Sequence, residues 1–242
     1  MLELKNIGFI VDDEDGSKEI IHDLNLQVAD KKFIVITGPN GSGKSTLAKI
    51  IAGIEKPSHG QIFLDGRNIT DLNITERAKT GIAFAFQQPV KFKGIKVFDL
   101  LKLASGNKLT VRDACDYLAE VGLCAKDYVY REVNSSLSGG ELKRIEIATV
   151  LARKSRITIF DEPEAGIDLW SFQNLIRIFE NMRKNITDSS IIVISHQERI
   201  LNIADEIAVL ANGRIEKQGT RSEIFPELVG TEAAVTICHR LK

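Results

Sequence analysis

The chain has 242 residues, a formal net charge of −1 at pH 7, and acidic and basic residues in almost equal number. This length suits one large α/β domain and is too short for two complete copies of one. The interspersed charges form no broad basic surface, so nucleic acid is not an expected partner. The apolar runs have strand length, far below the ~20 residues of a membrane helix, and the acidic amino-terminal region lacks a signal-peptide pattern. We therefore expect a cytoplasmic protein that does not insert into a membrane itself.

The first motif is a glycine-rich loop between an apolar strand at residues 33–36 and a helix whose apolar face runs from Leu47 to Ile54. In that context, backbone N–H groups and the helix N-terminus converge on phosphate oxygens. Lys44 is expected to reach the β- and γ-phosphates of a nucleotide, and the Ser45 hydroxyl to bind Mg²⁺. The predicted nucleotide-binding loop comprises Gly38, Pro39, Asn40, Gly41, Ser42, Gly43, Lys44, Ser45 and Thr46.

The segment after this loop predicts a change of architecture along the chain. An Asp65-Gly66 turn between β-like segments predicts a hairpin. From residue 87 to 138 the α/β pattern gives way to helical periodicity, with helices predicted at 97–104 and 111–121. We therefore expect a helical insertion in an α/β domain.

The insertion ends at Ser138, where Ser138-Gly139-Gly140 precede a helix predicted from Glu141 through Leu151. The Ser138 hydroxyl can donate a hydrogen bond, and the two glycines open the backbone at the start of the helix. This arrangement predicts a second anion site.

Two carboxylates follow the next apolar strand, at residues 157–160. Asp161 and Glu162 would lie at the carboxyl edge of a parallel sheet, where such folds bind ligands. Asp161 fits the Mg²⁺ site, and Glu162 is suited to polarise the water that attacks a phosphoryl group. The sequence therefore predicts that the protein binds and hydrolyses ATP.

These motifs, in this order, resemble those of the ATP-binding cassette (ABC) ATPases. The resemblance implies an α/β P-loop NTPase fold with a mainly parallel sheet core, an antiparallel β subdomain and a helical subdomain. Residues 1–242 would form one ABC ATPase domain, with residues 1–86 and 139–242 as the nucleotide-binding core and 87–138 as the helical subdomain ending at the signature motif. It also implies an ATP-dependent head-to-tail homodimer in which each signature closes over ATP held by the other subunit.

Further site residues follow only from that resemblance. Gln87, after the apolar strand at 82–86, resembles the glutamine that senses Mg²⁺ and the attacking water. Asp168 resembles the loop aspartate that links the two sites across the dimer, and it also suits the N-cap of the next helix. His196 resembles the switch histidine that contacts the γ-phosphate.

One family feature is missing from the amino-terminal region. ABC transporters commonly carry a tyrosine there that stacks on adenine, and this chain has Val11 at that place. Phe9 lies two residues earlier, and core packing is its expected role. At the other end, Cys238 and His239 could contribute to a shared metal site, but two ligands make no complete site.

Within the family, the residues after the signature, Glu141 to Ile147, are similar to those of SufC-like ATPases of iron–sulfur cluster assembly. That resemblance implies a soluble SufB/SufD-like scaffold as the driven partner. Two alternatives stay open: an ATPase subunit docked on a membrane permease, and a regulatory module that uses ATP only to switch contacts. Lys91, Lys93 and Lys96 around Phe92 form a small basic and apolar patch, for which a docking surface and an ordinary loop are equally open interpretations.

Overall fold

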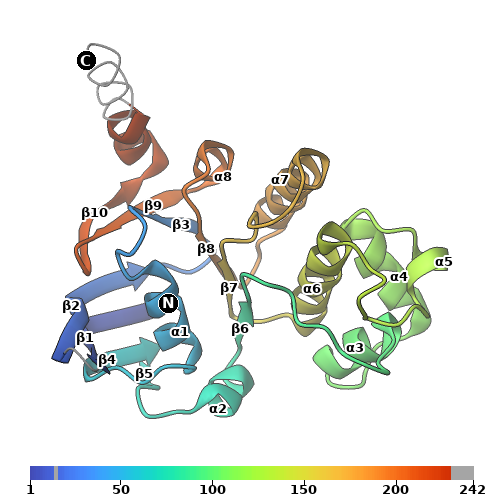
Figure 1. Ribbon diagram of the computed structural model, residues 1–242, viewed down its shortest axis with the longest axis horizontal. Coiled ribbons are helices and arrows are strands. Elements are labelled where there is room, and N and C mark those ends of the chain that lie inside the picture. Colours follow the sequence, from blue (N-terminus) through green and yellow to red (C-terminus); the bar gives the residue numbers. More distant parts are fainter. Residues whose placement is uncertain (14–15, 230–242) are drawn as a thin grey trace.

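The structure is a computed structural model that describes residues 1–13 and 16–229 (Figure 1). Cys238 and His239 lie outside the described residues. The strands are β1 (Leu2–Asp13), β2 (Gly16–Val28), β3 (Phe33–Thr37), β4 (His59–Leu64), β5 (Arg67–Asn68), β6 (Ile82–Ala85), β7 (Ile157–Asp161), β8 (Ser190–Ile194), β9 (Glu206–Ala211) and β10 (Arg214–Thr220). The helices are α1 (Lys44–Ala52), α2 (Ile74–Lys79), α3 (Val97–Ala104), α4 (Val111–Glu120), α5 (Ala125–Tyr128), α6 (Gly139–Arg153), α7 (Leu169–Lys184) and α8 (Glu198–Ile203).

The larger sheet has the strand order β10-β9-β3-β8-β7-β6, and all of its neighbouring strands except β10 and β9 run parallel. Its central strands are buried on both faces. In β3, Phe33 and Val35 belong to the core formed with α6 and α7. Ile34 and Ile36 point the other way, into the core formed with α1 and the smaller sheet. Burial on both faces explains the unbroken apolar runs in the sequence, and the predicted parallel core is confirmed.

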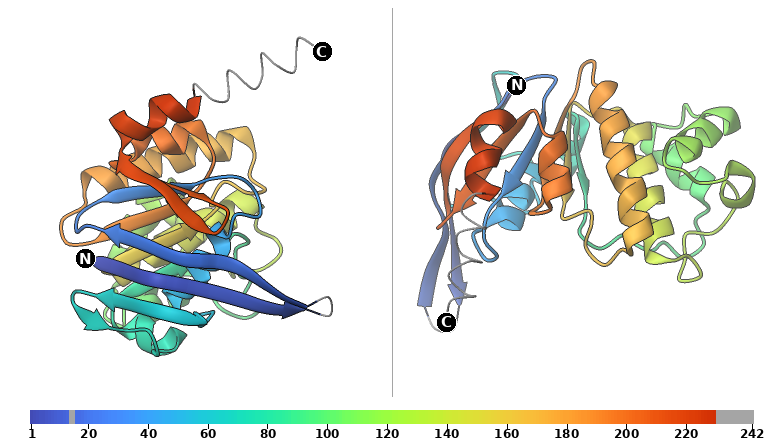
Figure 2. Two further views of the ribbon diagram at one scale, coloured as in Figure 1. Left: turned by 90° about the vertical axis from the view of Figure 1, so that its left-hand side faces the viewer. Right: turned by 90° about the horizontal axis from the view of Figure 1, so that it is seen from above.

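The smaller sheet is antiparallel, with the order β2-β1-β4-β5, and its long β1–β2 hairpin crosses the front of the molecule in the left view of Figure 2. Leu64 pairs with Arg67 around the predicted Asp65-Gly66 turn. The predicted antiparallel subdomain and its hairpin are therefore confirmed.

The helical segment lies at one side of the molecule, where α3 and α4 pack on α6 (Figure 1). The helices predicted at 97–104 and 111–121 correspond to α3 and α4, the second ending one residue earlier. Helix α6 also contacts β6, so it packs against both the helical segment and the parallel sheet. Within the described ranges, no helix has the length and apolarity needed to cross a membrane.

Arg77 on α2 is a fully buried charged side chain, with 1% of its surface exposed. Its guanidinium donates to the carbonyls of Ile50 and Ile51 in the last turn of α1. It also donates to Leu72 O at 3.0 Å and to Thr70 O at 2.7 Å. Burial lowers the pKa of Arg77 to about 10, so the group stays charged at neutral pH. Arg77 therefore satisfies the buried carbonyls of Ile51, Thr70 and Leu72, and it adds a second donor to Ile50 O, which also accepts from Gly53 N at 3.2 Å.

We expect Arg77→Met to destabilise the fold by roughly 2–4 kcal/mol, because it leaves several buried carbonyls without donors. The measurement is urea unfolding followed by circular dichroism. Arg67→Met, at an exposed position of β5, is the matched control and should change stability by less than about 0.5 kcal/mol. Equal midpoints for the two variants would contradict the role assigned to Arg77.

Candidate active site

The predicted nucleotide residues lie at one edge of the larger sheet. The phosphate loop follows β3, and His196 follows β8. Asp161 and Glu162 stand at the end of β7, and Gln87 follows β6. Because these four strands are parallel neighbours in the order β3-β8-β7-β6, their carboxyl ends bring together residues far apart in the sequence.

The phosphate loop has a backbone that requires glycine at two positions. Gly38 has φ +143°, and a Cβ there would lie 1.9 Å from Leu210 O. Gly43 is the N-cap of α1 with φ +99°, and a Cβ there would lie 2.9 Å from Ile21 Cδ1. The buried Ser42 hydroxyl has no hydrogen-bond partner among the described residues. A phosphate oxygen would satisfy that hydroxyl, so the loop fits its predicted ligand.

Lys44 folds back over its own loop. Its Nζ donates to Gly38 O at 2.9 Å and to Pro39 O at 2.8 Å. Burial lowers the pKa of Lys44, and the charges of Glu162 and Asp161 oppose that effect. The ammonium group is therefore already positioned at the loop, next to carboxylates that favour its charge.

Ser45 and Asp161, the two residues expected at the magnesium site, contact each other. The Ser45 hydroxyl donates to Asp161 Oδ1 at 2.9 Å. Burial raises the pKa of Asp161, the bond from Ser45 opposes this, and the charge of Glu162 adds to it. One hydroxyl and one carboxylate suit Mg²⁺, which usually takes few protein ligands and completes its shell with water and phosphate oxygens.

Glu162 is held from two sides. Gln87 Nε2 donates to Glu162 Oε2 at 2.6 Å, which joins the ends of β6 and β7. The Glu162 backbone has φ 41°, in the left-handed region, and its N–H donates to Ile194 O at 3.0 Å at the end of β8. That conformation costs a non-glycine residue of order 1–3 kcal/mol. The backbone turn and the Gln87 bond together determine where this carboxylate lies.

His196 is exposed at the end of β8, and its Nε2 lies 3.2 Å from Gln197 Nε2. The sequence alone did not single out Glu164, which supports the same loop. The buried Ser195 hydroxyl donates to Glu164 Oε1 and accepts from Gln197 N at 3.0 Å. The sequence signal for Glu164 would have been its position two residues after Glu162, in a loop that follows a buried strand.

The signature motif forms the start of α6. The Ser138 hydroxyl accepts from Glu141 N at 3.2 Å, and Glu141 Oε2 accepts from Ser138 N at 2.6 Å. Ser138 and Gly139 are exposed, whereas a Cβ on Gly140 would lie 2.4 Å from Ser171 Oγ at the start of α7. Strands β6 and β7 stand between α6 and α1 in Figure 1. The signature therefore presents its polar end outward and not to the phosphate loop of its own chain.

Asp168 is the N-cap of α7, as predicted. Its Oδ1 accepts from Trp170 N at 2.9 Å and from Ser171 N at 3.0 Å. Hydrogen bonds from Ser171 lower the pKa of Asp168. Leu169 and Trp170 beside it are 68% and 81% exposed. Because Gly140 contacts Ser171, the signature and this loop form one continuous surface.

The amino-terminal strand has no adenine-stacking aromatic at the predicted place. Phe9 is half-buried and packs against the core of the smaller sheet, as expected, and Val11 is 41% exposed. The phosphate-binding residues are thus more completely assembled than any base-binding surface.

Comparisons with known proteins agree with this geometry. The sequence profile of a family described as ABC transporter matches residues 21–165. The uncharacterized ABC transporter ATP-binding protein MJ0035 of Methanocaldococcus jannaschii is 39% identical, over 86% of each chain. The probable ATP-dependent transporter ycf16 of Cyanophora paradoxa is 34% identical, over 94% of this chain and 91% of that protein. The ATP-binding cassette MJ0796, solved as a dimer in a post-hydrolysis state bound to ADP and Pi, superposes with a TM-score of 0.80 at 23% identity, over 91% of this chain and 99% of that one.

Glu164 provides a test of the site by pH. Burial raises the pKa of its carboxyl above the ordinary value of 4.5, and the bond from Ser195 opposes this. The folded protein therefore holds the Glu164 proton more tightly than the unfolded chain does, and stability is lost as pH rises above that value. In Glu164→Gln this loss disappears.

We expect the difference in melting temperature, Glu164→Gln minus wild type, to increase from pH 4.5 to pH 8. Differential scanning fluorimetry across that range measures it. Glu216→Gln, at an exposed position of β10, is the control and should give a nearly constant difference. A difference that falls with pH for Glu164→Gln would show that the carboxylate is stabilised in the fold.

Proposed function

The chain belongs to the ABC transporter family and is an ABC-type ATPase, and we propose that it is the ATP-hydrolysing subunit of a membrane transporter. One observation supports the hydrolysis of ATP. At the edge of the sheet beside the phosphate loop, Gln87 bonds to Glu162 and Ser45 bonds to Asp161. The relatives described as transporter proteins support the choice of partner.

In this proposal the residues of the sheet edge divide the work of phosphoryl transfer. Lys44 leaves its loop carbonyls to bind the β- and γ-phosphates, and Glu162 accepts a hydrogen bond from the attacking water. Gln87 orients the same water, and His196 donates to the γ-phosphate. Mg²⁺ bound at Ser45 and Asp161 would neutralise phosphate charge.

The exposed signature lies away from the phosphate loop of its own chain, which supports a head-to-tail homodimer. Ser138 and Gly139 are exposed at a helix N-terminus and would bind the γ-phosphate of ATP held by the second subunit. Asp168, beside them, would link the two sites. ATP would thus hold the closed dimer together, and hydrolysis would release it.

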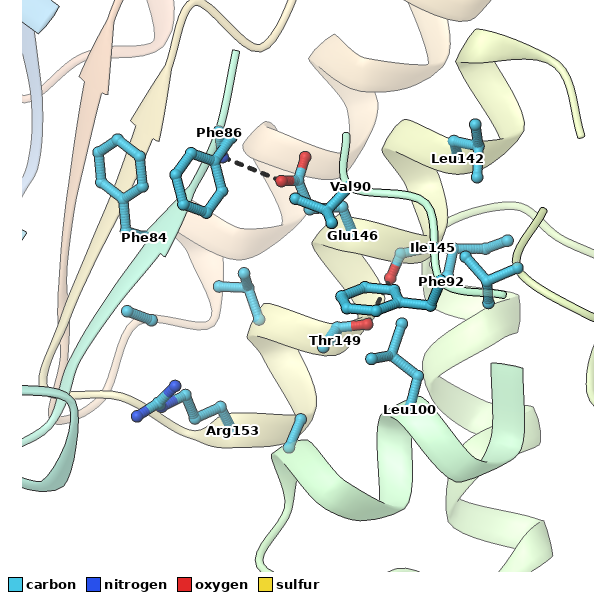
Figure 3. A pocket seen from close by; sticks show the side chains of 14 residues that line it. Phe84, Phe86, Val90, Phe92, Leu100, Leu142, Ile145, Glu146, Thr149 and Arg153 are labelled. Atoms are coloured by element: carbon cyan, nitrogen blue, oxygen red, sulfur yellow. Dashed lines mark hydrogen bonds between the residues drawn. The ribbon is translucent and has the colours of Figure 1, made fainter. Parts of the chain in front are cut away.

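A transporter partner has a place to dock beside the segment that carries Gln87. An apolar cavity of about 170 Å³ lies between β6, α3 and α6, where Figure 3 shows Phe92 and Leu100 next to Val90 and Ile145. It is smaller than the roughly 300 Å³ or more of typical ligand pockets, so it suits side chains of a protein. We propose that it receives an amphipathic helix of a permease on the cytoplasmic side.

Charge supports that occupant. Lys91, Lys93 and Lys96 are exposed on the segment that borders the cavity. A helix with an apolar face and flanking acidic residues would complement them.

A SufB/SufD-like scaffold is the second candidate partner. The observation that favours it is the run from Glu141 to Ile147, which is similar to that of SufC-like ATPases. Affinity purification of the tagged chain from detergent-solubilised native cells under anaerobic conditions separates the two. We expect a polytopic membrane protein to copurify, whereas a soluble protein that carries an iron–sulfur cluster would favour the scaffold.

Glu162→Gln tests the catalytic assignment. We expect kcat for ATP hydrolysis to fall by ~10²-fold or more, because one group that stabilises the transition state is lost. ATP binding should persist, and closed dimers should accumulate with ATP in analytical ultracentrifugation. Glu180→Gln, away from the sheet edge, is the control and should match wild type. Unchanged turnover in Glu162→Gln would remove Glu162 from the mechanism.

A further inference from the structure

The peptide of Phe86, directly before Gln87, is held by an ion pair on α6. Glu146 Oε1 accepts from Phe86 N at 2.9 Å, the dashed contact between these residues in Figure 3. Lys143 Nζ donates to Phe86 O and lies 2.9 Å from Glu146 Oε2. One turn of the helix thus supplies both an acceptor and a donor to a single residue of the neighbouring segment.

The pairing of β6 with β7 does not extend to Phe86. Ala85 is the last residue of β6 that pairs with β7, so the backbone groups of Phe86 need partners from elsewhere. The cost is considerable, because Lys143 is 2% exposed and a buried ion pair seldom stabilises a fold more than apolar side chains of similar volume. The Lys143–Glu146 ion pair is therefore explained by a role other than stabilising the fold.

We propose that Lys143 and Glu146 are positioning residues for Gln87. By fixing Phe86 they direct the Gln87 amide to Glu162, where Nε2 and Oε2 are 2.6 Å apart. The inference rests on the proposed function, in which Glu162 polarises the attacking water. It also makes α6 the connection between the signature at its N-terminus and the catalytic carboxylate.

Glu146→Ala is the first test. We expect kcat to fall roughly 10-fold or more, because a misplaced Gln87 no longer orients the reacting groups, while KM for ATP stays within about twofold. Glu146→Gln keeps a carbonyl that can accept from Phe86 N, and it should recover most of the rate. Amide hydrogen exchange in the peptide that contains Phe86 should be faster in Glu146→Ala than in wild type.

Two further variants exclude a merely structural effect. Lys143→Met with Glu146→Leu replaces the pair by apolar side chains, so no unpaired charge is left buried, and it should show the same loss of kcat. In a Gln87→Ala background, Glu146→Ala should cause no additional loss, since both changes remove one function.

Asp205→Ala is the matched control. Asp205 accepts from Phe33 N at 2.9 Å and pairs with Arg183, so it makes the same kind of contact away from Gln87. Its kcat should match wild type. The proposal is overturned by an equal kcat loss in this control, by additive losses with Gln87→Ala, or by unchanged exchange at Phe86. If Gln87→Ala alone left kcat unchanged, the catalytic role of Gln87 would fail, while the exchange rate would still report the contact.

Discussion

Burial of the parallel strands on both faces is the constraint on which the site depends. The central strands are mostly apolar along their length because two cores cover them, so charged side chains are placed where the strands end. The order β3-β8-β7-β6 then brings the four ends together. The polar residues of the parallel strands thus gather at one edge, next to the start of α1, which contributes Lys44 and Ser45.

The second feature of the site is that each of its three neighbouring carboxylates accepts a hydrogen bond from another segment. Asp161, Glu162 and Glu164 lie within four residues of chain, and burial together with the charge of Glu162 raises the pKa of Asp161 and of Glu164. Each accepts a hydrogen bond from a different segment: Asp161 from α1, Glu162 from the end of β6, and Glu164 from the end of β8. Those bonds join the loop after β7 to its neighbours, so the charges that the chemistry needs also tie the segments together.

Much of the fold was predictable because local patterns determine it. The phosphate loop, the central strands, α3 and the Asp65-Gly66 hairpin turn follow from periodicity and turn residues, and the structure confirms them. The start of α6 was predicted two residues late, because consecutive glycines disfavour helix, but the reciprocal Ser138–Glu141 cap outweighs that preference.

The sequence could not reveal contacts between segments that become neighbours only through the order of the strands in the sheet. β8 lies between β3 and β7, although it follows both in the chain. The Ser195–Glu164 bond and the bonds of Lys143 and Glu146 to Phe86 depend on such neighbours and have no local signature. Arg77 is similar, because a charged residue in a short helix normally predicts an exposed face.

Helix α6 connects the signature, the apolar cavity and the residue before Gln87. Its N-terminus carries the exposed signature, its side lines the apolar cavity, and its ion pair holds the residue before Gln87. Hydrogen bonds weaken steeply with distance and angle, so a small displacement of one rigid helix would alter the 2.6 Å contact between Gln87 and Glu162. A partner in the cavity and a second subunit at the signature would then both act on the contact between Gln87 and Glu162 through the same helix.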